Sequence, residues 1–285
     1  MTTVLDEATI PTDDGRTLYG RWFEPVGRPR GVVVVAPAMA TDAAYYRHLA
    51  SWLRDQQLAV LLFDYRGYGW SGSGALADVD ADAMRWMLDA RDAAAYAIER
   101  ADGLPVTWIG HSLGGQALGV VPHERLAGAV LVASGTGTWR YNVASLRWRA
   151  PLLWKVIAPV AIAVSGYFPG KRLGVLGDVP PHVMRQWGRW CMQRDYLWSE
   201  FPDLVTAYEE VTTPTVSLSF VDDELLAERS FRDLADRLPN AVVEFLRVSP
   251  ADHDLRAVGH HGFFRKDKAA LWESLLLPRL ATLPS

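Results

Sequence analysis

The motif Gly-x-Ser-x-Gly at residues 110–114, centred on Ser112, is the feature that most limits what this chain can fold into. An apolar run over residues 105–109 precedes the motif, and a run of small, helix-compatible residues, 115–121, follows it. A serine placed in this way between a strand and a helix is typical of a nucleophile elbow, a sharp and strained turn. The five-residue pattern also recurs by chance, so the inference depends on these flanks. Together they predict a strand–turn–helix unit that exposes the Ser112 hydroxyl.

Apolar strand runs and amphipathic helices alternate along the rest of the chain. Strands are predicted over residues 4–24 (two or three antiparallel strands), 32–35, 58–63, 105–109, 126–133, 211–221 and 241–248, with helices over about 42–56, 80–100, 227–238 and 266–277. Strands separated by helices predict an α/β fold, with a mostly parallel central sheet flanked by helices. A chain of 285 residues, 49% of them apolar, is large enough to bury the core of one such domain.

Residues 135–208 interrupt this alternation. The segment has no convincing strand and contains tryptophans at 139, 148, 154, 187, 190 and 198 and prolines at 151, 159, 169, 180 and 181. The prolines are expected to divide it into several short helices. Long insertions in compact domains are usually functional, so we expect a helical cap at 135–208 inserted into a core made of 1–134 and 209–285. An ordinary peripheral pack of helices is the alternative.

The longest apolar region, residues 151–164, lies inside this insertion. Lys155 and Pro159 interrupt it, and it is too short to span a bilayer, so no integral membrane segment is expected. Its apolar stripe of Leu152, Trp154, Ile157, Val160 and Ile162 either touches a membrane surface or, as is more common, faces the protein core.

Composition narrows the range of partners. A net charge of −4 gives no electrostatic reason to expect nucleic acid as a partner. The single cysteine, Cys191, excludes an internal disulfide and a cysteine-rich metal site, and no metal or other cofactor is expected. The N-terminal residues lack the basic start and apolar stretch of a secretory signal, so a cytoplasmic location is expected. A homodimer is left open.

A serine hydroxyl needs a neighbouring base to become a nucleophile. The order Ser, then Asp or Glu, then His is the one that Gly-x-Ser-x-Gly hydrolases follow. Only His253, His260 and His261 come after the last predicted strand. His260 follows Gly259 just before the final helix and is the preferred base, with His253 as the alternative, although order and loop position alone leave all three open.

The acid is expected at the end of a strand between Ser112 and the histidine. Asp222, Asp223 and Glu224 follow the predicted strand at 211–221. One of them is expected to orient the imidazole, while the others act as caps of the following helix. The spacing from the strand end narrowly favours Asp223, with Asp222 as the alternative acid.

The tetrahedral intermediate of acyl transfer also needs two backbone donors, an oxyanion hole. The amide of Leu113, directly after the serine, is one candidate. The second is expected from the loop at 37–40. Because Pro37 has no N–H, Met39 or Ala38 must supply it.

Three stretches, 110–115, 64–72 (Asp-Tyr-Arg-Gly-Tyr-Gly-Trp-Ser-Gly) and 259–260, together resemble the α/β-hydrolase superfamily, in particular its serine-aminopeptidase-like and monoacylglycerol-lipase-like hydrolases. Residues 36–39, 166–170 and 259–264 are similar to a poorly characterised bacterial subgroup of it. The resemblance covers nearly the whole chain and is weakest in the insertion.

This resemblance implies that Ser112 is the nucleophile, that His260 is the base, and that the acid is Asp222 or Asp223. Lining up residues 37–40 with the family's His-Gly-x-Gly also implies Met39 and Leu113 as oxyanion donors. The chain departs from the family at Pro37, where histidine is usual.

The expected activity is that of a serine hydrolase, a carboxylesterase or lipase-like enzyme. It would cleave an ester of an apolar or aromatic small molecule through an acyl-enzyme on Ser112, because the aromatic insertion favours such substrates. The preference for esters over amides or thioesters comes from the resemblance. The alternatives are a carbon–carbon bond hydrolase or an acyltransferase with the same triad, and a non-catalytic protein that binds a small molecule.

Overall fold

The computed structural model describes residues 5–281, and its centre is an eight-stranded sheet with the strand order β1-β2-β4-β3-β5-β6-β7-β8. The strands are β1 (Leu5–Pro11), β2 (Thr17–Phe23), β3 (Gly31–Ala36), β4 (Leu58–Phe63), β5 (Val106–His111), β6 (Gly128–Val132), β7 (Thr215–Phe220) and β8 (Val243–Val248). β2 pairs antiparallel with β1 and β4, and every other neighbouring pair is parallel. The mostly parallel α/β sheet predicted from the sequence is therefore confirmed.

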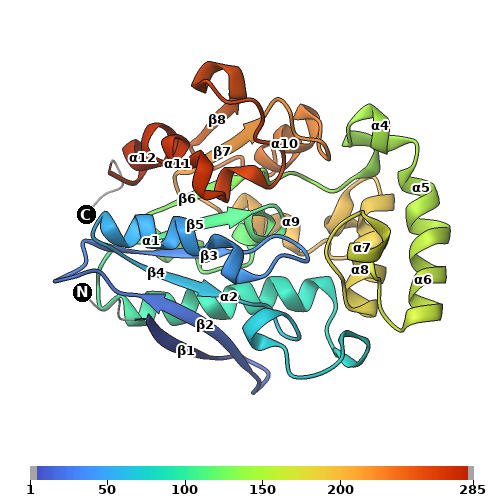
Figure 1. The fold of residues 1–285 in the computed structure, drawn as a ribbon, viewed down its shortest axis with the longest axis horizontal. Helices are drawn as coiled ribbons and strands as arrows, with labels where there is room; N and C mark the ends of the chain where they lie inside the picture. Colours follow the sequence, from blue (N-terminus) through green and yellow to red (C-terminus); the bar gives the residue numbers. More distant parts are fainter. Residues whose placement is uncertain (1–4, 282–285) are drawn as a thin grey trace.

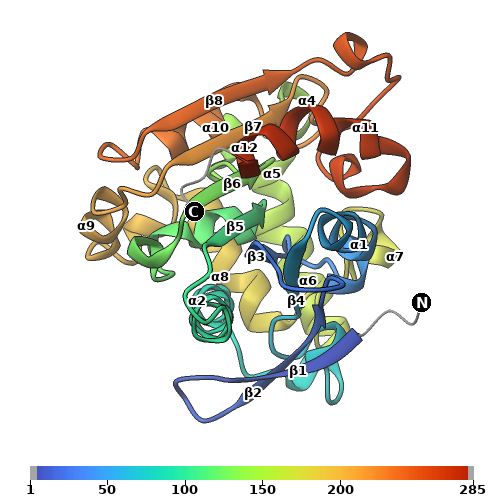
Figure 2. The same cartoon turned by 90° about the vertical axis from the view of Figure 1, so that its left-hand side faces the viewer.

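Helices cover both faces of this sheet (Figure 2). α2 (Ala83–Arg100) packs on one face, and α1 (Arg47–Asp55) lies on the other face with α11 (Ala269–Leu271) and α12 (Leu277–Ala281). Side chains of a strand alternate between faces, so Val34 of β3 joins the core under α2 while Val33 joins the core under α1. This double coverage explains why the central strands are continuous apolar runs.

The helix after Ser112 is shorter than the sequence predicts. α3 (Leu113–Gln116) is one turn long and passes into a 3₁₀ turn, Ala117–Gly119. Pro122 is the third residue after that turn and cannot continue a helix. α10 (Glu228–Ala235), between β7 and β8, agrees with its predicted position.

Residues 135–208 lie between β6 and β7 and form a helical insertion outside the sheet. It contains α4 (Ala144–Arg147), α5 (Ala150–Leu152), α6 (Ala158–Ser165), α7 (Gly170–Leu173), α8 (Pro181–Met192) and most of α9 (Leu204–Glu209). Figure 1 shows α4 to α8 beyond the carboxyl ends of the parallel strands. The predicted absence of strands holds apart from two isolated bridges, Asn142–Leu226 and Phe168–Val179.

The prolines at 151 and 159 do not break this region as expected. Pro151 lies in the first turn of α5, where its missing N–H is harmless. A π-helical turn, Leu153–Ile157, precedes Pro159 and joins α5 to α6. The helical stretch 144–165 is therefore 22 residues long, and by length and composition alone it could cross a membrane, with 22% of its most apolar window buried. The apolar segment is thus longer and less interrupted than the sequence indicated.

Candidate active site

Ser112 lies in a strained turn between β5 and α3. Its backbone has φ 51° and ψ −112°, a conformation that residues other than glycine rarely adopt. A Cβ atom at Gly110 would lie 2.4 Å from the Cα of Gly115. At Gly114 a Cβ would lie 2.3 Å from the carbonyl oxygen of Ala36 on the adjacent β3. Both glycines are therefore required by close backbone approach, as the motif predicted.

The structure brings Ser112, His260 and Asp223 into one hydrogen-bonded chain. His260 Nε2 lies 3.1 Å from Ser112 Oγ, and His260 Nδ1 lies 2.7 Å from Asp223 Oδ2. With the Nδ1–H tautomer, His260 donates to Asp223 and accepts from the serine hydroxyl. The imidazole and the carboxylate are almost fully buried, whereas Ser112 is partly exposed. The three residues follow β5, β7 and β8, whose carboxyl ends meet at one edge of the sheet.

The second carboxylate oxygen of Asp223 is held by the backbone. Asp223 Oδ1 accepts hydrogen bonds from the N–H groups of Leu225 and Leu226, both at 2.8 Å. These two bonds fix the carboxylate so that Oδ2 points at His260. The aspartate therefore caps its own turn with one oxygen and orients the imidazole with the other.

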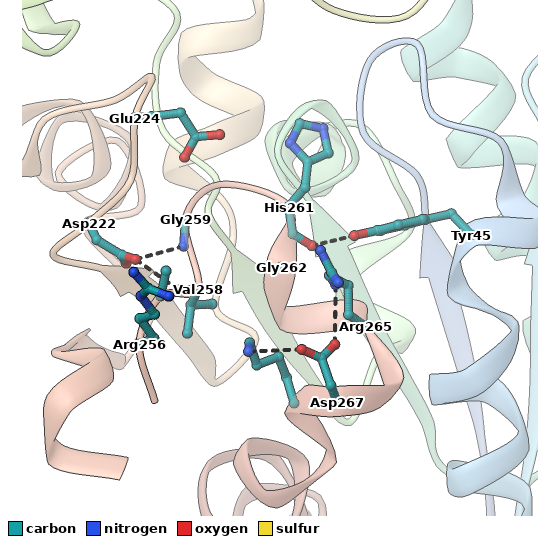
Figure 3. Close-up of a pocket in the computed structure, with 12 residues that line it drawn as sticks. Tyr45, Asp222, Glu224, Arg256, Val258, Gly259, His261, Gly262, Arg265 and Asp267 are labelled. Atoms are coloured by element: carbon teal, nitrogen blue, oxygen red, sulfur yellow. Dashed lines mark hydrogen bonds and ion pairs between the residues drawn. The ribbon is translucent and has the colours of Figure 1, made fainter. Parts of the chain in front are cut away.

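The two acids beside Asp223 hold the backbone of the loop at 258–262, here called the histidine loop. Asp222 Oδ2 accepts from the amides of Val258 at 2.8 Å and Gly259 at 3.1 Å (Figure 3). Glu224 Oε2 accepts from the amide of His260 at 2.9 Å. Asp222, the alternative acid, thus binds loop amides and makes no hydrogen bond to the imidazole. The expectation that these two acids only cap a helix is also wrong, and no local signal in the sequence indicates their contacts with a loop so far along the chain.

The other two candidate histidines lie apart from the serine. His253 ends a short 3₁₀ turn after β8 and makes no hydrogen bond to Ser112 or Asp223. The ring of His261 lies edge-on to the ring of His111 and tilted against the ring of His260, with ring centroids 5.1 Å apart in both pairs. Burial, with a contribution from His260, lowers the pKa of His261 to about 4 and keeps it neutral at pH 7. Of the three histidines left open, only His260 contacts Ser112.

A buried hydrogen-bond chain that sequence analysis did not predict joins three loops of the site. The Ala38 amide donates to Tyr46 Oη at 2.9 Å, Tyr46 Oη lies 2.8 Å from His111 Nδ1, and His111 Nε2 lies 3.0 Å from the carbonyl oxygen of His260. Burial lowers the pKa of His111 well below its usual range, so the ring is neutral. A neutral ring with its proton on Nε2 donates to His260 and accepts from Tyr46. The chain ties the 37–40 loop to the elbow and to the histidine loop.

These contacts distinguish the two candidates for the second oxyanion donor. The amide of Ala38 is taken by Tyr46, whereas the amides of Met39 and Leu113 donate to no other described residue. The carbonyl oxygen of Pro37 accepts from Tyr65 Oη at 2.9 Å, which holds the loop without the histidine usual in the family. Among the described residues, Met39 and Leu113 therefore keep N–H groups without an acceptor.

A polar groove lies along the histidine loop and is drawn in Figure 3. Its lining carries charges of both signs, with Asp267 paired to Arg265 at 3.1 Å and to Lys268 at 3.0 Å. Tyr45 Oη donates to the carbonyl oxygen of His261 at 2.8 Å on one side of it. Neither Ser112 nor His260 lines this groove. Within residues 5–281, no group of three or more His, Cys, Asp or Glu side chains could hold a metal ion.

Comparison with known proteins gives a family match and several curated relatives. A family model described as "Serine aminopeptidase, S33" matches residues 27–172, which include Ser112 and the 37–40 loop. A human monoglyceride lipase is 29% identical over 123 residues, 42% of this chain and 40% of that protein. A monoacylglycerol lipase of Mycolicibacterium smegmatis is 28% identical over 194 residues, 68% of this chain and 59% of that protein. The chain thus spans about half the length of these relatives.

The fold has solved counterparts along its whole length. A soluble variant of the monoglyceride lipase of Saccharomyces cerevisiae, solved with a substrate analogue, superposes with a TM-score of 0.67 at 16% identity. The superposition covers 100% of this chain and 97% of that one. Identity this low establishes the α/β-hydrolase fold and nothing finer. The family match spans more than half of the chain, so this protein belongs to the serine aminopeptidase S33 family of α/β-hydrolases.

Proposed function

We propose that this protein is a serine hydrolase that cleaves a carboxylic ester of an apolar or aromatic small molecule through an acyl-enzyme on Ser112. The observation that carries the proposal is the continuous chain from Asp223 through His260 to the Ser112 hydroxyl, with links of 2.7 and 3.1 Å. Nucleophile, base and orienting acid at such distances are the arrangement that acyl transfer needs. Membership of the family and the two lipase relatives support the same reaction class.

In the first half of the reaction, His260 Nε2 takes the hydroxyl proton while Ser112 Oγ attacks the ester carbonyl. The free amides of Leu113 and Met39 bind the oxygen that becomes negative. Asp223 stabilises the imidazolium that forms. His260 then gives its proton to the departing alcohol oxygen, and the acyl group stays on Ser112.

In the second half, a water molecule loses a proton to His260 and attacks the acyl carbonyl. The C–O bond to Ser112 breaks, and His260 returns its proton to the serine oxygen. The carboxylic acid leaves and the enzyme is restored. Three successive loop amides donate hydrogen bonds to the carboxylates of Asp222 and Glu224, and these bonds support the cycle by holding the His260 backbone in place.

An apolar acyl group suits the surroundings of the nucleophile. Leu113, directly after the nucleophile, and Met39 belong to one apolar core cluster and are nearly fully buried, and the insertion lies beyond this end of the sheet. The tryptophans of the insertion support an aromatic substrate less than the sequence indicated. Trp154 packs on Trp187 with ring centroids 4.9 Å apart, so these two partly buried rings are used for packing.

The proposal is tested with the hydrolysis of short and long p-nitrophenyl esters and with labelling by a fluorophosphonate probe. Wild-type protein should hydrolyse the esters and take one label. Ser112→Ala should lose about four to six orders of magnitude in kcat and all labelling. Ser145→Ala, at an exposed serine of the insertion, is the matched control and should behave as wild type.

Two outcomes would contradict the proposal. Labelling or turnover that survives in Ser112→Ala would remove the serine from the mechanism. A folded wild-type protein that neither labels nor turns over any ester would indicate a binding protein. Equal turnover of strongly polar and apolar esters would contradict the substrate preference alone.

A further inference from the structure

The outer face of the helical stretch 144–165 is apolar and exposed. An outer stripe of five residues follows it at intervals of four: Trp148 (74% exposed), Leu152 (54%), Val156 (49%), Val160 (57%) and Val164 (81%). Residues four apart drift around an α-helix, which has 3.6 residues per turn, and the wider π-helical turn in the middle of the stretch offsets part of this drift. The stripe is therefore a nearly continuous apolar surface rather than scattered side chains.

The inner face of the same stretch is used for packing. Ala158 and Ile162 are 3% exposed, and Trp154 packs against Trp187 of α8. The apolar stripe identified in the sequence therefore does not face the core as a whole. Trp154 and Ile162 face the protein, whereas Leu152 and Val160 face outward. The inner contacts hold the helix along the insertion, so the outer stripe is presented side-on.

The sequence segment that carries this stripe is basic. Residues 135–177 contain Arg140, Arg147, Arg149, Lys155, Lys171 and Arg172 and not one Asp or Glu. None of these six side chains forms an ion pair with a described residue. The whole chain has a net charge of −4, so with +6 here the remainder carries −10. This segment is the basic end of an otherwise acidic protein.

We propose that this face docks on an anionic lipid surface, with the outer stripe in the interface and the cations on the headgroups. Helices that lie in a membrane interface combine an apolar face with Lys and Arg, and Trp is favoured at that depth. Negative lipids attract such clusters of basic residues. A symmetric contact with a second copy would instead bring the same six cations against each other.

The position of the stripe gives the docking a direction. α5 and α6 form the edge of the molecule beyond the carboxyl ends of the strands (Figure 1), which is the end that carries Ser112. Docking through this edge turns that end of the sheet toward the lipid. The proposal concerns a surface and holds whether or not the proposed ester hydrolysis is correct.

Flotation with vesicles tests the docking. Wild-type protein should float with vesicles of equal parts phosphatidylglycerol and phosphatidylcholine, should not float with phosphatidylcholine alone, and should bind less at high salt. The double variant Val160→Asp, Val164→Asp should lose binding. The triple variant Arg149→Gln, Lys171→Gln, Arg172→Gln should bind about 100-fold more weakly, since each basic residue near such a surface contributes about fivefold.

Matched controls are Val242→Asp and Arg28→Gln, at exposed positions outside the insertion, and both should bind as wild type. Thermal unfolding and ester hydrolysis of every variant, measured separately, distinguish lost docking from lost folding or lost activity. Absent or equal binding to the two vesicle types would overturn the proposal, as would wild-type binding by the double variant. The proposal would also be overturned if the wild-type protein formed a dimer, the double variant were monomeric, and neither protein bound vesicles. Bound protein that resists alkaline extraction would indicate a spanning helix instead.

Discussion

The loops around Ser112 and the outer face of the helical stretch 144–165 differ in how their side chains are buried and paired. Around the serine, polar groups are buried and paired with each other, as in the chain Ala38–Tyr46–His111–His260. On the helix, apolar side chains such as Val164 are exposed and the cations have no ion-pair partner among the described residues. The first region is determined by contacts within the fold. In the second region, the exposed apolar side chains and the cations have few partners within the fold.

This difference indicates where a substitution acts. A change in the loops around Ser112 removes a contact that no solvent can replace, so it should alter stability and activity together. A change on the outer stripe removes no internal contact, so it should leave the fold intact and alter only docking. Three predictions test the comparison, from the largest expected effect to the smallest.

A glycine of the turn at Ser112 and a glycine of the insertion, outside the helical stretch 144–165, should respond differently to an added methyl group. Gly114→Ala places a Cβ 2.3 Å from the Ala36 carbonyl oxygen, between two fixed backbones, and should destabilise the fold by about 4 kcal/mol or more. Gly174→Ala, in the insertion, has φ +65° but no atom within 4 Å of the new Cβ. It should cost about 1–2 kcal/mol from backbone strain alone. Urea unfolding measures both, and similar losses would contradict the comparison.

Asp64 should make stability depend on pH. It lies after β4, and burial raises its pKa to about 7 although the amides of Ala43 and Trp70 donate to it. A carboxyl with a raised pKa in the fold stabilises it fully below the unfolded value of 3.8, and this contribution is lost as pH rises through about 7.

The check is urea unfolding of wild type and Asp64→Asn across this range. Because the asparagine does not titrate, the advantage of wild type should shrink by up to about 4 kcal/mol between pH 4 and pH 8, at about 1.36 kcal/mol per pKa unit. Parallel stability curves for the two proteins would show that Asp64 does not titrate in this way.

Two adjacent tyrosines give the smallest and most local test. Tyr46→Phe leaves the buried Ala38 amide without an acceptor and should cost about 1–3 kcal/mol. It should also slow ester hydrolysis by about tenfold to 100-fold, since the 37–40 loop and the histidine loop lose their link. Tyr45→Phe removes a hydrogen bond to the His261 carbonyl that water can replace. Its effect on stability and on the rate of ester hydrolysis should therefore be much smaller. If the two variants match, the buried chain has no special role.

The sequence alone indicates those features of the fold that depend on neighbouring residues. The paired glycines around Ser112 indicate a turn that tolerates no side chain, and continuous apolar strands indicate a sheet covered on both faces. Both features of the fold are confirmed, because each depends on residues close together in the chain. The division into core and cap, and the roles of Ser112, Asp223, His260, Leu113 and Met39, remain predictions that the geometry supports.

Which of two adjacent candidate residues has the right contacts depends on the tertiary structure. Asp223 rather than Asp222 meets His260 because the turn after β7 aims one carboxylate at the ring and the other at loop amides. Met39 rather than Ala38 keeps a free amide because Tyr46 takes the other.

The same holds for the helix at 144–165, where the π-helical turn before Pro159 and the contacts of Trp154 decide which side faces out. Sequence by itself determined the sheet, the elbow and the order of the polar residues, since steric limits and side-chain periodicity act over a few positions. Only the tertiary structure could decide which side chains meet, because His260 reaches Ser112 across 148 residues of chain and no local pattern encodes that contact.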